Sequence, residues 1–398
     1  MTKILPFKAV RPAREFAGLV ASRSYEDYNE EELKAQLEFN PYSFLHIINP
    51  GYKFQHEIGG EKRFGMVKNR YLEFREDCTF IQDELPSYYI YKIHTRDGDC
   101  CGIIAAASVE DYENNIIKRH EDTIAHREEL FKEYLKVVGF NTEPVLLTYP
   151  DDPVINDLLK ERMKSRPEYE FATANKEIHS LWLIDEPENI EKIRQQFAAI
   201  QQLYIADGHH RTASSFRLSK EKGPKFFMSF LINEDYIKIY SFNRILMKLK
   251  DLNKENLILE LSKKFVIKEI KKLDFQSKKE NEILLYLKNN SYSLIPKKES
   301  YNGDILSRLS YSILSNNIIN PLFNLDDNSE KIKYYNGKKN IEEITKIIDK
   351  NKNSLAFFLK PIKMKNIRKI ADQNLVLPPK STYIEPKLRS GITILDLK

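Results

Sequence analysis

Two adjacent histidines stand between a glycine and an arginine in the stretch YIADGHHRTASS, residues 204–215. An apolar run ends at Asp207, Gly208 permits close backbone approach, and a helix is expected to start near Thr212. Free backbone N–H groups and the positive end of the helix dipole would then meet at one point, which favours an anion. Arg211 adds a planar fork suited to phosphate or carboxylate oxygens. This turn therefore predicts an anion site.

The other side chains of the turn fit phosphate chemistry in different ways. His209 and His210 can donate hydrogen bonds in neutral or charged form. Asp207 would repel a bare phosphate, so we expect it to hold a Mg²⁺ ion that bridges phosphate oxygens or to orient a histidine. The plainer alternative is a tight strand-to-helix turn whose polar residues only cap the helix. A zinc site is a weaker interpretation, because no further His or Cys lies at ligand spacing.

Two stretches before this turn could complete the site. ASRSYEDYNEEE places Arg23 and Glu26 in a loop before a helix, where Glu26 can be an exposed base and Arg23 can bind an anion. Its alternative is helix capping by acidic residues. IKRHEDTIAHREE offers Lys118, Arg119 and His120 to an anionic ligand, with Glu121, Thr123 and Arg127 nearby. Here the alternative is a charged helix face with i,i+4 pairs.

A third stretch lies near the C-terminus. LPPKSTYIEPKLRSG, residues 377–391, holds three prolines together with Lys380, Ser381, Thr382, Lys387 and Arg389. We expect a proline-stiffened strap, which either crosses a surface or brings Lys380 and Ser381 to the anion site.

The elements that must position these residues alternate between helix and strand patterns. We expect a hairpin turning at Asp97-Gly98, a helical region over 109–138 broken near Thr123, and a second hairpin over 225–246 turning at 233–235. The fold class is then α+β, a mixed sheet with flanking helices. We expect one domain over 1–245 and a smaller basic α+β region over 246–398 that ends in the strap.

Composition narrows the function classes. Residues 241–398 hold 31 Lys and Arg against 18 Asp and Glu, a net +13, whereas residues 1–240 hold 32 against 40, a net −8. The lysines are scattered without interleaved stacking aromatics, so coding bias explains them better than a nucleic-acid surface does. No apolar run approaches the roughly 20 residues that span a bilayer, and no signal peptide is visible. Three cysteines form no disulfide framework. We expect a cytoplasmic protein that binds neither membrane nor nucleic acid.

The sequence resembles the bacterial family catalogued as domain of unknown function 1015 (DUF1015). The resemblance covers nearly the whole chain outside 250–345 and rests on FKAVRP, NPYSFLHIINP, GIIAAASVEDYENNIIKRHEDT, EPVLLTYP, YIADGHHRTASS and LPPKSTYIEPKLRSG. The family's N-terminal pattern is a Pro-Tyr-Asp-Val run. Here Ser24-Tyr25-Glu26-Asp27 stands in its place, so the proline is lost and the carboxylate is one methylene longer.

The stretch from Asp207 to Arg211 is also similar to the motif of free-serine kinases with a ParB/sulfiredoxin-like fold. That resemblance implies phosphoryl transfer between ATP or ADP and free L-serine, or from phosphoserine in reverse, with Mg²⁺ and with Glu26 as the base. In this hypothesis phosphate is bound by Gly208, Arg211 and Thr212, and His209 or His210 stabilises the developing charge. The substrate carboxylate or a phosphate would meet the cations at 118–120.

Two other functions fit the same residues. A ParB-like module could sense nucleotide at the turn and use the basic half to bind nucleic acid, although no helix-turn-helix pattern is visible. A phosphatase could use the same site with water as the acceptor. No Gly-rich loop ending in Gly-Lys-Ser/Thr is present, so an ordinary P-loop kinase is excluded.

Overall fold

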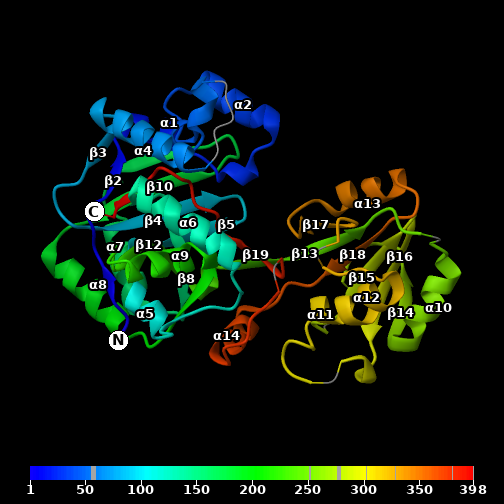
Figure 1. Ribbon diagram of the computed structural model, residues 1–398. Coiled ribbons are helices and arrows are strands. Elements are labelled where there is room, and N and C mark those ends of the chain that lie inside the picture. The colour runs from blue at the N-terminus through cyan, green and yellow to red at the C-terminus, as the bar shows by residue number, and fades with distance from the viewer. Residues whose placement is uncertain are drawn as a thin grey trace. The chain divides into compact units, whose positions relative to one another are not determined.

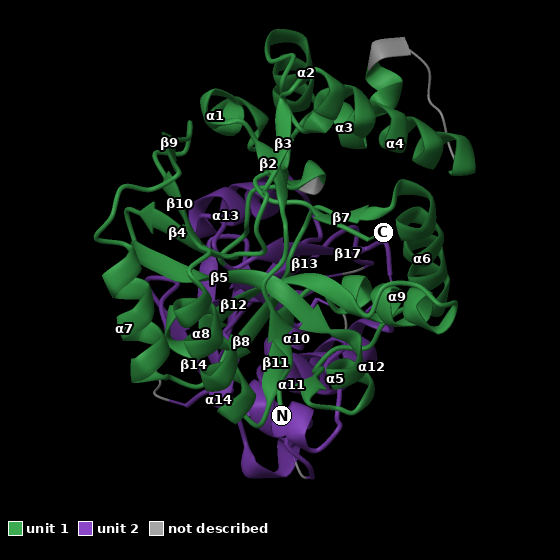
Figure 2. Cartoon of the chain, turned by 90° about the vertical axis from the view of Figure 1, so that its left-hand side faces the viewer, with its two compact units in different colours: residues 1–237, 386–398 green, residues 238–385 purple. Residues whose placement is uncertain are grey.

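The computed structural model describes residues 1–54, 60–250, 252–275, 279–301, 303–327, 329–378 and 380–397, without the side chains of Glu26, Lys53 and Phe54. Internal contacts divide it into two units, which Figure 2 shows in different colours: residues 1–237 with 386–398, and residues 238–385. The chain leaves the first unit, builds the second and comes back. The expected boundary after residue 245 falls inside a strand of the second unit, and the expected strap at 377–391 is divided between the units.

The first unit is built on a mixed sheet. Its described strands are β1 (Ile4–Leu5), β4 (Tyr88–Thr95), β5 (Gly98–Ser108), β6 (Ile117–Lys118), β8 (Val145–Tyr149), β9 (Tyr169–Ala172), β10 (Ile178–Ile184), β11 (Leu203–Asp207) and β12 (Phe226–Asn233). They follow the order β6-β11-β8-β12-β5-β4-β10-β9, with β1 pairing against β5. β11 runs parallel to β6, and β12 parallel to β8, while the other pairs are antiparallel. The predicted mixed α+β fold is confirmed.

Helices cover this sheet, and Figure 1 shows two of them, α6 and α9, side by side. The described helices of the first unit are α1 (Ala17–Val20), α2 (Glu30–Phe39), α3 (Leu45–Ile48), α4 (Gly60–Glu76), α5 (Val109–Glu113), α6 (Ala125–Val138), α7 (Pro153–Arg162), α8 (Pro187–Ala199) and α9 (His209–Lys220). Leu159 of α7 and Phe197 of α8 share one buried core with Leu147 and Ile205 of the sheet. Within the described ranges, none of the chain's helices combines the length and apolar composition needed to cross a bilayer.

A smaller core lies beside this sheet. It joins α1, α3 and α4 to two short strand pairs, β2 (Val10–Pro12) with β3 (Phe80–Gln82) and β7 (Phe140–Asn141) with β20 (Leu395–Asp396). Because β20 belongs to the last residues of the chain, the returning C-terminus is part of the first unit's packing.

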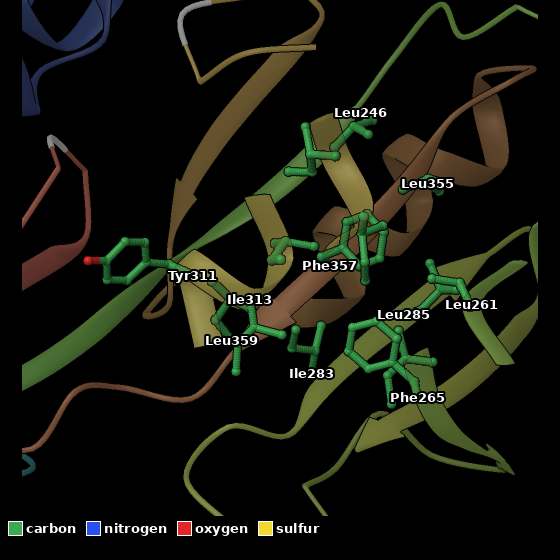
Figure 3. Close-up of a cluster of buried hydrophobic side chains, with 14 of the residues drawn as sticks. Leu246, Leu261, Phe265, Ile283, Leu285, Tyr311, Ile313, Leu355, Phe357 and Leu359 are labelled. Atoms are coloured by element: carbon green, nitrogen blue, oxygen red, sulfur yellow. The ribbon is translucent and has the colours of Figure 1, made fainter. Parts of the chain in front are cut away.

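The second unit is an antiparallel sheet that is buried on both faces. Its described strands are β13 (Lys238–Leu246), β14 (Phe265–Ile270), β15 (Ile283–Leu287), β16 (Asn290–Pro296), β17 (Ile332–Asn336), β18 (Leu355–Leu359) and β19 (Thr382–Glu385). Its described helices are α10 (Lys254–Lys264), α11 (Ser310–Leu314), α12 (Asn320–Phe323), α13 (Ile341–Lys350) and α14 (Met364–Asp372). Leu285 and Phe357 join the core shown in Figure 3, whereas Leu284 and Phe358 join a second core with α13. This alternation is the period of two expected for a strand.

The hairpin predicted over 225–246 is wrong. β12 pairs with β5 and β8 in the first unit, whereas β13 pairs with β17, β18 and β19 in the second. The 3₁₀ turn η4 (Glu234–Tyr236) carries the chain from one sheet to the other. Two consecutive strands have the same apolar alternation whether they pair with each other or with distant strands, so the pattern could not separate these cases.

The helical region predicted over 109–138 is interrupted over a longer stretch than expected. α5 ends at Glu113 and α6 begins at Ala125; between them Asn115, with φ of 57°, turns the chain and β6 pairs with β11. The interruption brings residues 117–121 beside the strand that ends at Asp207. By contrast, the predicted hairpin at Asp97-Gly98 is confirmed by the pairing of β4 with β5.

Candidate functional site

The predicted anion site lies at the turn between β11 and α9. β11 ends at Asp207, Gly208 takes a left-handed conformation with φ of 100°, and α9 begins at His209 and not near Thr212. A Cβ atom at Gly208 would lie 3.1 Å from Nε of Arg211, in a conformation that other residues rarely adopt. Gly208 caps the N-terminus of α9 and has no side chain that could accept hydrogen bonds from the first backbone N–H groups of the helix. These groups and the helix dipole favour a negatively charged ligand.

Two cations hold the carboxylate of Asp207. Nη2 of Arg211 donates to Oδ2 at 2.7 Å, and Nζ of Lys387 donates to Oδ1 at 2.8 Å. Nη1 of Arg211 also donates to the carbonyl of Pro144 at 2.9 Å, which fixes the plane of the guanidinium. Burial alone would raise the pKa of Asp207, but Arg211 and Lys387 outweigh burial and hold this pKa below its usual value. The turn therefore presents two positive groups around an ionised carboxylate.

These contacts do not fit the Mg²⁺ ligand role expected for Asp207. Each of its two oxygens is already bonded to a cation. In the part of the chain that the structure describes, no group of three or more His, Cys, Asp or Glu side chains could hold a metal ion. The other role expected for Asp207 was to orient a histidine, but the groups that donate hydrogen bonds to its two oxygens are Arg211 and Lys387.

The histidines around the turn have depressed pKa values. The rings of His120 and His209 meet edge to face with centroids 4.6 Å apart, and the backbone N–H of His120 donates to Nε2 of His209 at 3.4 Å. Burial lowers the pKa of His120 to about 4 and that of His209 well below its usual value. Burial and the nearby Arg127 also lower the pKa of His210. At neutral pH the site therefore holds neutral imidazoles, and its positive charge comes from Arg211 and Lys387.

His210 and Thr212 differ in what they can offer to a ligand. Nδ1 of His210 is buried and has no hydrogen-bond partner among the described residues. Thr212 donates to the carbonyl of Gly208 with both its backbone N–H, at 3.0 Å, and its hydroxyl, at 3.2 Å. Thr212 thus closes the first turn of α9, whereas Nδ1 of His210 has hydrogen-bonding capacity that the described residues leave unused.

The other predicted anion-binding residues lie in three places. Lys118 is buried in β6, which pairs with β11, and Arg119 follows it as an exposed side chain. Arg23 is engaged by residues close to it in sequence: Nη2 donates to Glu32 in the first turn of α2 at 2.9 Å, and the guanidinium lies 4.2 Å from the centre of the Tyr28 ring. The segment at 118–120 therefore adjoins the turn through the pairing of β6 with β11.

Lys380 and Ser381 belong to the second unit. Nζ of Lys380 lies 4.6 Å from the centre of the Tyr334 ring, and Oγ of Ser381 donates to the carbonyl of Pro378 at 2.7 Å. Within the same strap, Lys387 is the lysine that contacts Asp207.

The returning tail links the turn to the N-terminal loop. Ser390 follows Lys387 by three residues and exchanges two backbone hydrogen bonds with Ser22, at 2.8 and 3.2 Å. Oγ of Ser390 also donates to Glu143 at 3.2 Å, and Glu143 lies 3.7 Å from Nη1 of Arg211. The chain after Ser22 runs directly into the loop that contains position 26. One connected set of contacts therefore joins this loop to Arg211 and the predicted anion site.

Glu26 itself lies in the 3₁₀ turn η2 (Tyr25–Asp27), four residues after Ser22, and its side chain is outside the described part of the structure. The tail that contacts this loop is itself held in the first unit by an ion pair between Arg389 and Glu177, at 3.0 Å. His179, whose Nε2 lies 3.5 Å from a carboxylate oxygen of Glu177, and then Arg389 lower the pKa of Glu177 to about 2, although burial acts in the opposite direction. This pair stays ionised across the physiological pH range.

Lys387 and Glu121 were not among the site residues predicted from the sequence. Glu121 directly follows the buried His120 and is itself half-buried. Burial and the nearby Asp207 raise the pKa of Glu121 to about 7, while Lys387 opposes that shift. Both residues lie in charged stretches that the sequence analysis had singled out. The return of the tail to the first unit, however, is a tertiary contact that no local sequence pattern predicts.

Comparisons with solved structures find distant likeness. A free serine kinase (E30Q mutant) in complex with AMP shares 15% identity, with 75% of this chain and 92% of that chain covered and a TM-score of 0.39. SbnI with a C-terminal truncation from Staphylococcus aureus shares 12% identity, with coverage of 73% and 87% and a TM-score of 0.39. A conserved hypothetical protein from Pyrococcus furiosus shares 15% identity, with coverage of 74% and 95% and a TM-score of 0.37.

Among curated proteins, none matches this sequence. The model of one protein family, described as "Protein of unknown function (DUF1015)", matches residues 4–327.

Proposed function

This chain belongs to the DUF1015 family, and we propose that it is a phosphotransferase that moves a phosphoryl group between a nucleotide, ATP or ADP, and the hydroxyl of free L-serine, in either direction. The observation that carries the proposal is the meeting of Arg211, Lys387 and the N-terminus of α9 at one turn. Phosphoryl transfer depends on positioning and on positive charge around the transferring oxygens more than on a covalent nucleophile. This turn supplies both.

The roles follow from the contacts. Arg211 and the first N–H groups of α9 bind phosphate oxygens, and Asp207 fixes the direction of the guanidinium. When a phosphate enters, Lys387 can exchange part of its pairing with Asp207 for a phosphate oxygen. His210 contributes a neutral ring with an unpartnered buried nitrogen, as far as the described residues show. His209 is held by His120 and stays in the wall of the site.

Glu26 is the proposed base. It takes the proton of the serine hydroxyl while Oγ attacks the terminal phosphorus and the shortened nucleotide leaves. The support for this role is the link from Ser22 to Ser390, because it ties the loop of Glu26 to the tail that carries Lys387. A phosphatase would use the same cations with water as the acceptor, and a nucleotide-gated module would bind the nucleotide without transfer.

Phosphorus NMR on the purified full chain tests the function. With ATP or ADP, Mg²⁺ and L-serine, we expect a phosphoserine signal that requires serine, and with phosphoserine and the shorter nucleotide we expect the reverse. Release of inorganic phosphate independent of serine would indicate the phosphatase. Nucleotide binding without any new phosphorus signal, together with strongly salt-dependent retention on DNA, would indicate the module.

The two lysines of the strap give a matched comparison. Lys387→Met removes a charge-assisted hydrogen bond from the phosphate site, and we expect nucleotide affinity to fall by about tenfold or more. Lys380→Met changes a lysine that lies over Tyr334 in the second unit, and we expect less than about a threefold change. Fluorescence titration with a labelled nucleotide measures both. Equal losses in the two variants, or a larger loss at Lys380, would contradict the assignment of Lys387.

A further inference from the structure

Glu121 lies in the first unit, and its carboxylate has no role in the reaction proposed above. It is half-buried and follows His120, whose ring packs edge to face on His209 at the start of α9. Its segment is held in place by the pairing of β6 with β11. Its backbone therefore follows the strand that pairs with β11, and its carboxylate lies within electrostatic range of Asp207 and Lys387.

The charged groups near Glu121 do not neutralise its carboxylate. Asp207, at the end of β11, and Lys387, in the tail, are the charged groups close enough to affect it. Lys387 gives its hydrogen bond to Asp207, and within the described ranges Glu121 makes no ion pair shorter than 4 Å. His120 and His209 are neutral at pH 7, so they add no positive charge. Burial and Asp207 accordingly raise the pKa of Glu121 to about 7.

A half-buried carboxylate in this state favours a ligand that brings a positive charge with N–H donors. A phosphate or a substrate carboxylate cannot supply this, since both are repelled by Glu121. A primary ammonium group can, because it neutralises the carboxylate and donates up to three hydrogen bonds.

We propose that Glu121 binds the α-ammonium group of the acceptor, so that the site selects hydroxy amino acids over hydroxy acids of the same length. This inference rests on the proposed function, because it names what the acceptor carries besides its hydroxyl. The acceptor lies with its ammonium at Glu121 and its hydroxyl toward the phosphate held by Arg211. Glu121 is thus a specificity-determining residue, separate from the phosphate-binding cations.

The test compares L-serine with 3-hydroxypropionate, which lacks only the ammonium group. Binding of each is measured by calorimetry to the full chain in the presence of ADP at pH 8. We expect the wild type to prefer L-serine by at least about tenfold, and Glu121→Gln to lose that preference while its affinity for 3-hydroxypropionate stays within about threefold. Glu113→Gln, which changes an exposed glutamate paired with Lys220 on α5, is the control and should keep the preference.

A change of pH provides a readout that a purely structural role would not move. Glu121 must be ionised to bind an ammonium, so the affinity for L-serine should fall about tenfold from pH 8 to pH 6 as the group with a pKa of about 7 becomes protonated. The affinity for 3-hydroxypropionate should not show this fall, and Glu121→Gln should abolish it for L-serine.

The outcomes separate this inference from the proposed function. If the wild type transfers phosphate to serine but Glu121→Gln keeps the preference for L-serine, the inference is overturned and the function stands. If the wild type prefers L-serine through Glu121 but transfers no phosphate, the inference stands and the function is overturned. A Glu121→Gln variant that alters only the Mg²⁺ dependence of nucleotide binding would also overturn it, as would a wild type without any preference between the two ligands.

Discussion

Replacing Glu26 by glutamine is expected to lower kcat for serine phosphorylation at least about a hundredfold, with little effect on nucleotide affinity. An amide cannot accept the hydroxyl proton, whereas the phosphate-binding groups belong to other segments. These segments are the turn at 207–211 and the tail at Lys387. Initial rates by coupled nucleotide assay, with nucleotide affinity from direct titration, measure the two quantities separately.

Two further variants sharpen this prediction. Glu26→Asp restores the shorter carboxylate of the Pro-Tyr-Asp-Val pattern of the resembled family, and we expect a rate between those of the wild type and Glu26→Gln. Glu31→Gln, in the exposed first turn of α2, removes a nearby negative charge and should leave the rate within about twofold. A well-folded Glu26→Gln protein with the wild-type rate would remove Glu26 from the mechanism and move the search for a base to another carboxylate.

The turn at Asp207 could be predicted from sequence because its determinants are local. A short apolar run, a glycine and a polar helix start lie within a few residues, and the observed φ of 100° at Gly208 is the conformation that glycine supplies. The hairpin at Asp97-Gly98 was predictable for the same reason. Such features depend on backbone sterics within a single turn.

What could not be predicted depends on contacts between distant residues. β12 and β13 look like a hairpin, yet they pair with strands of different sheets. Lys387 reaches Asp207 across 180 positions, after the chain has built a separate unit. The sequence marked the strap as rich in cations but favoured Lys380, because no local pattern tells which lysine lies beyond the point where the chain rejoins the first unit. The burial that raises the pKa of Glu121 is likewise a property of the assembled fold.

Arg211→Ala is expected to lower kcat/KM for phosphoryl transfer by about a hundredfold to a thousandfold. In the proposed mechanism the guanidinium supplies charge and oriented donors to the phosphate, and Lys387 alone cannot reproduce the planar fork. The effect on folding should be small, because Arg211 and Asp207 are both about a third exposed, at 31% and 34%, and such pairs contribute about 1 kcal/mol or less. We therefore expect Arg211→Ala to lose activity while its melting temperature stays close to that of the wild type, with both measured on the same preparation.

Arg211→Lys distinguishes charge from geometry. The lysine keeps the positive charge but loses the simultaneous bonds to Asp207 and to the carbonyl of Pro144, so we expect at least about a tenfold loss of kcat/KM. Arg194→Ala on α8 removes an exposed arginine that pairs with Glu191. It is the matched control and should leave kcat/KM unchanged. If Arg211→Ala kept kcat/KM within about threefold, the phosphate would have to bind elsewhere, and the roles of Asp207 and Lys387 would fall with it. If Arg211→Lys kept the wild-type kcat/KM and Arg211→Ala did not, the site would need a cation at this turn but not the planar guanidinium that Asp207 orients.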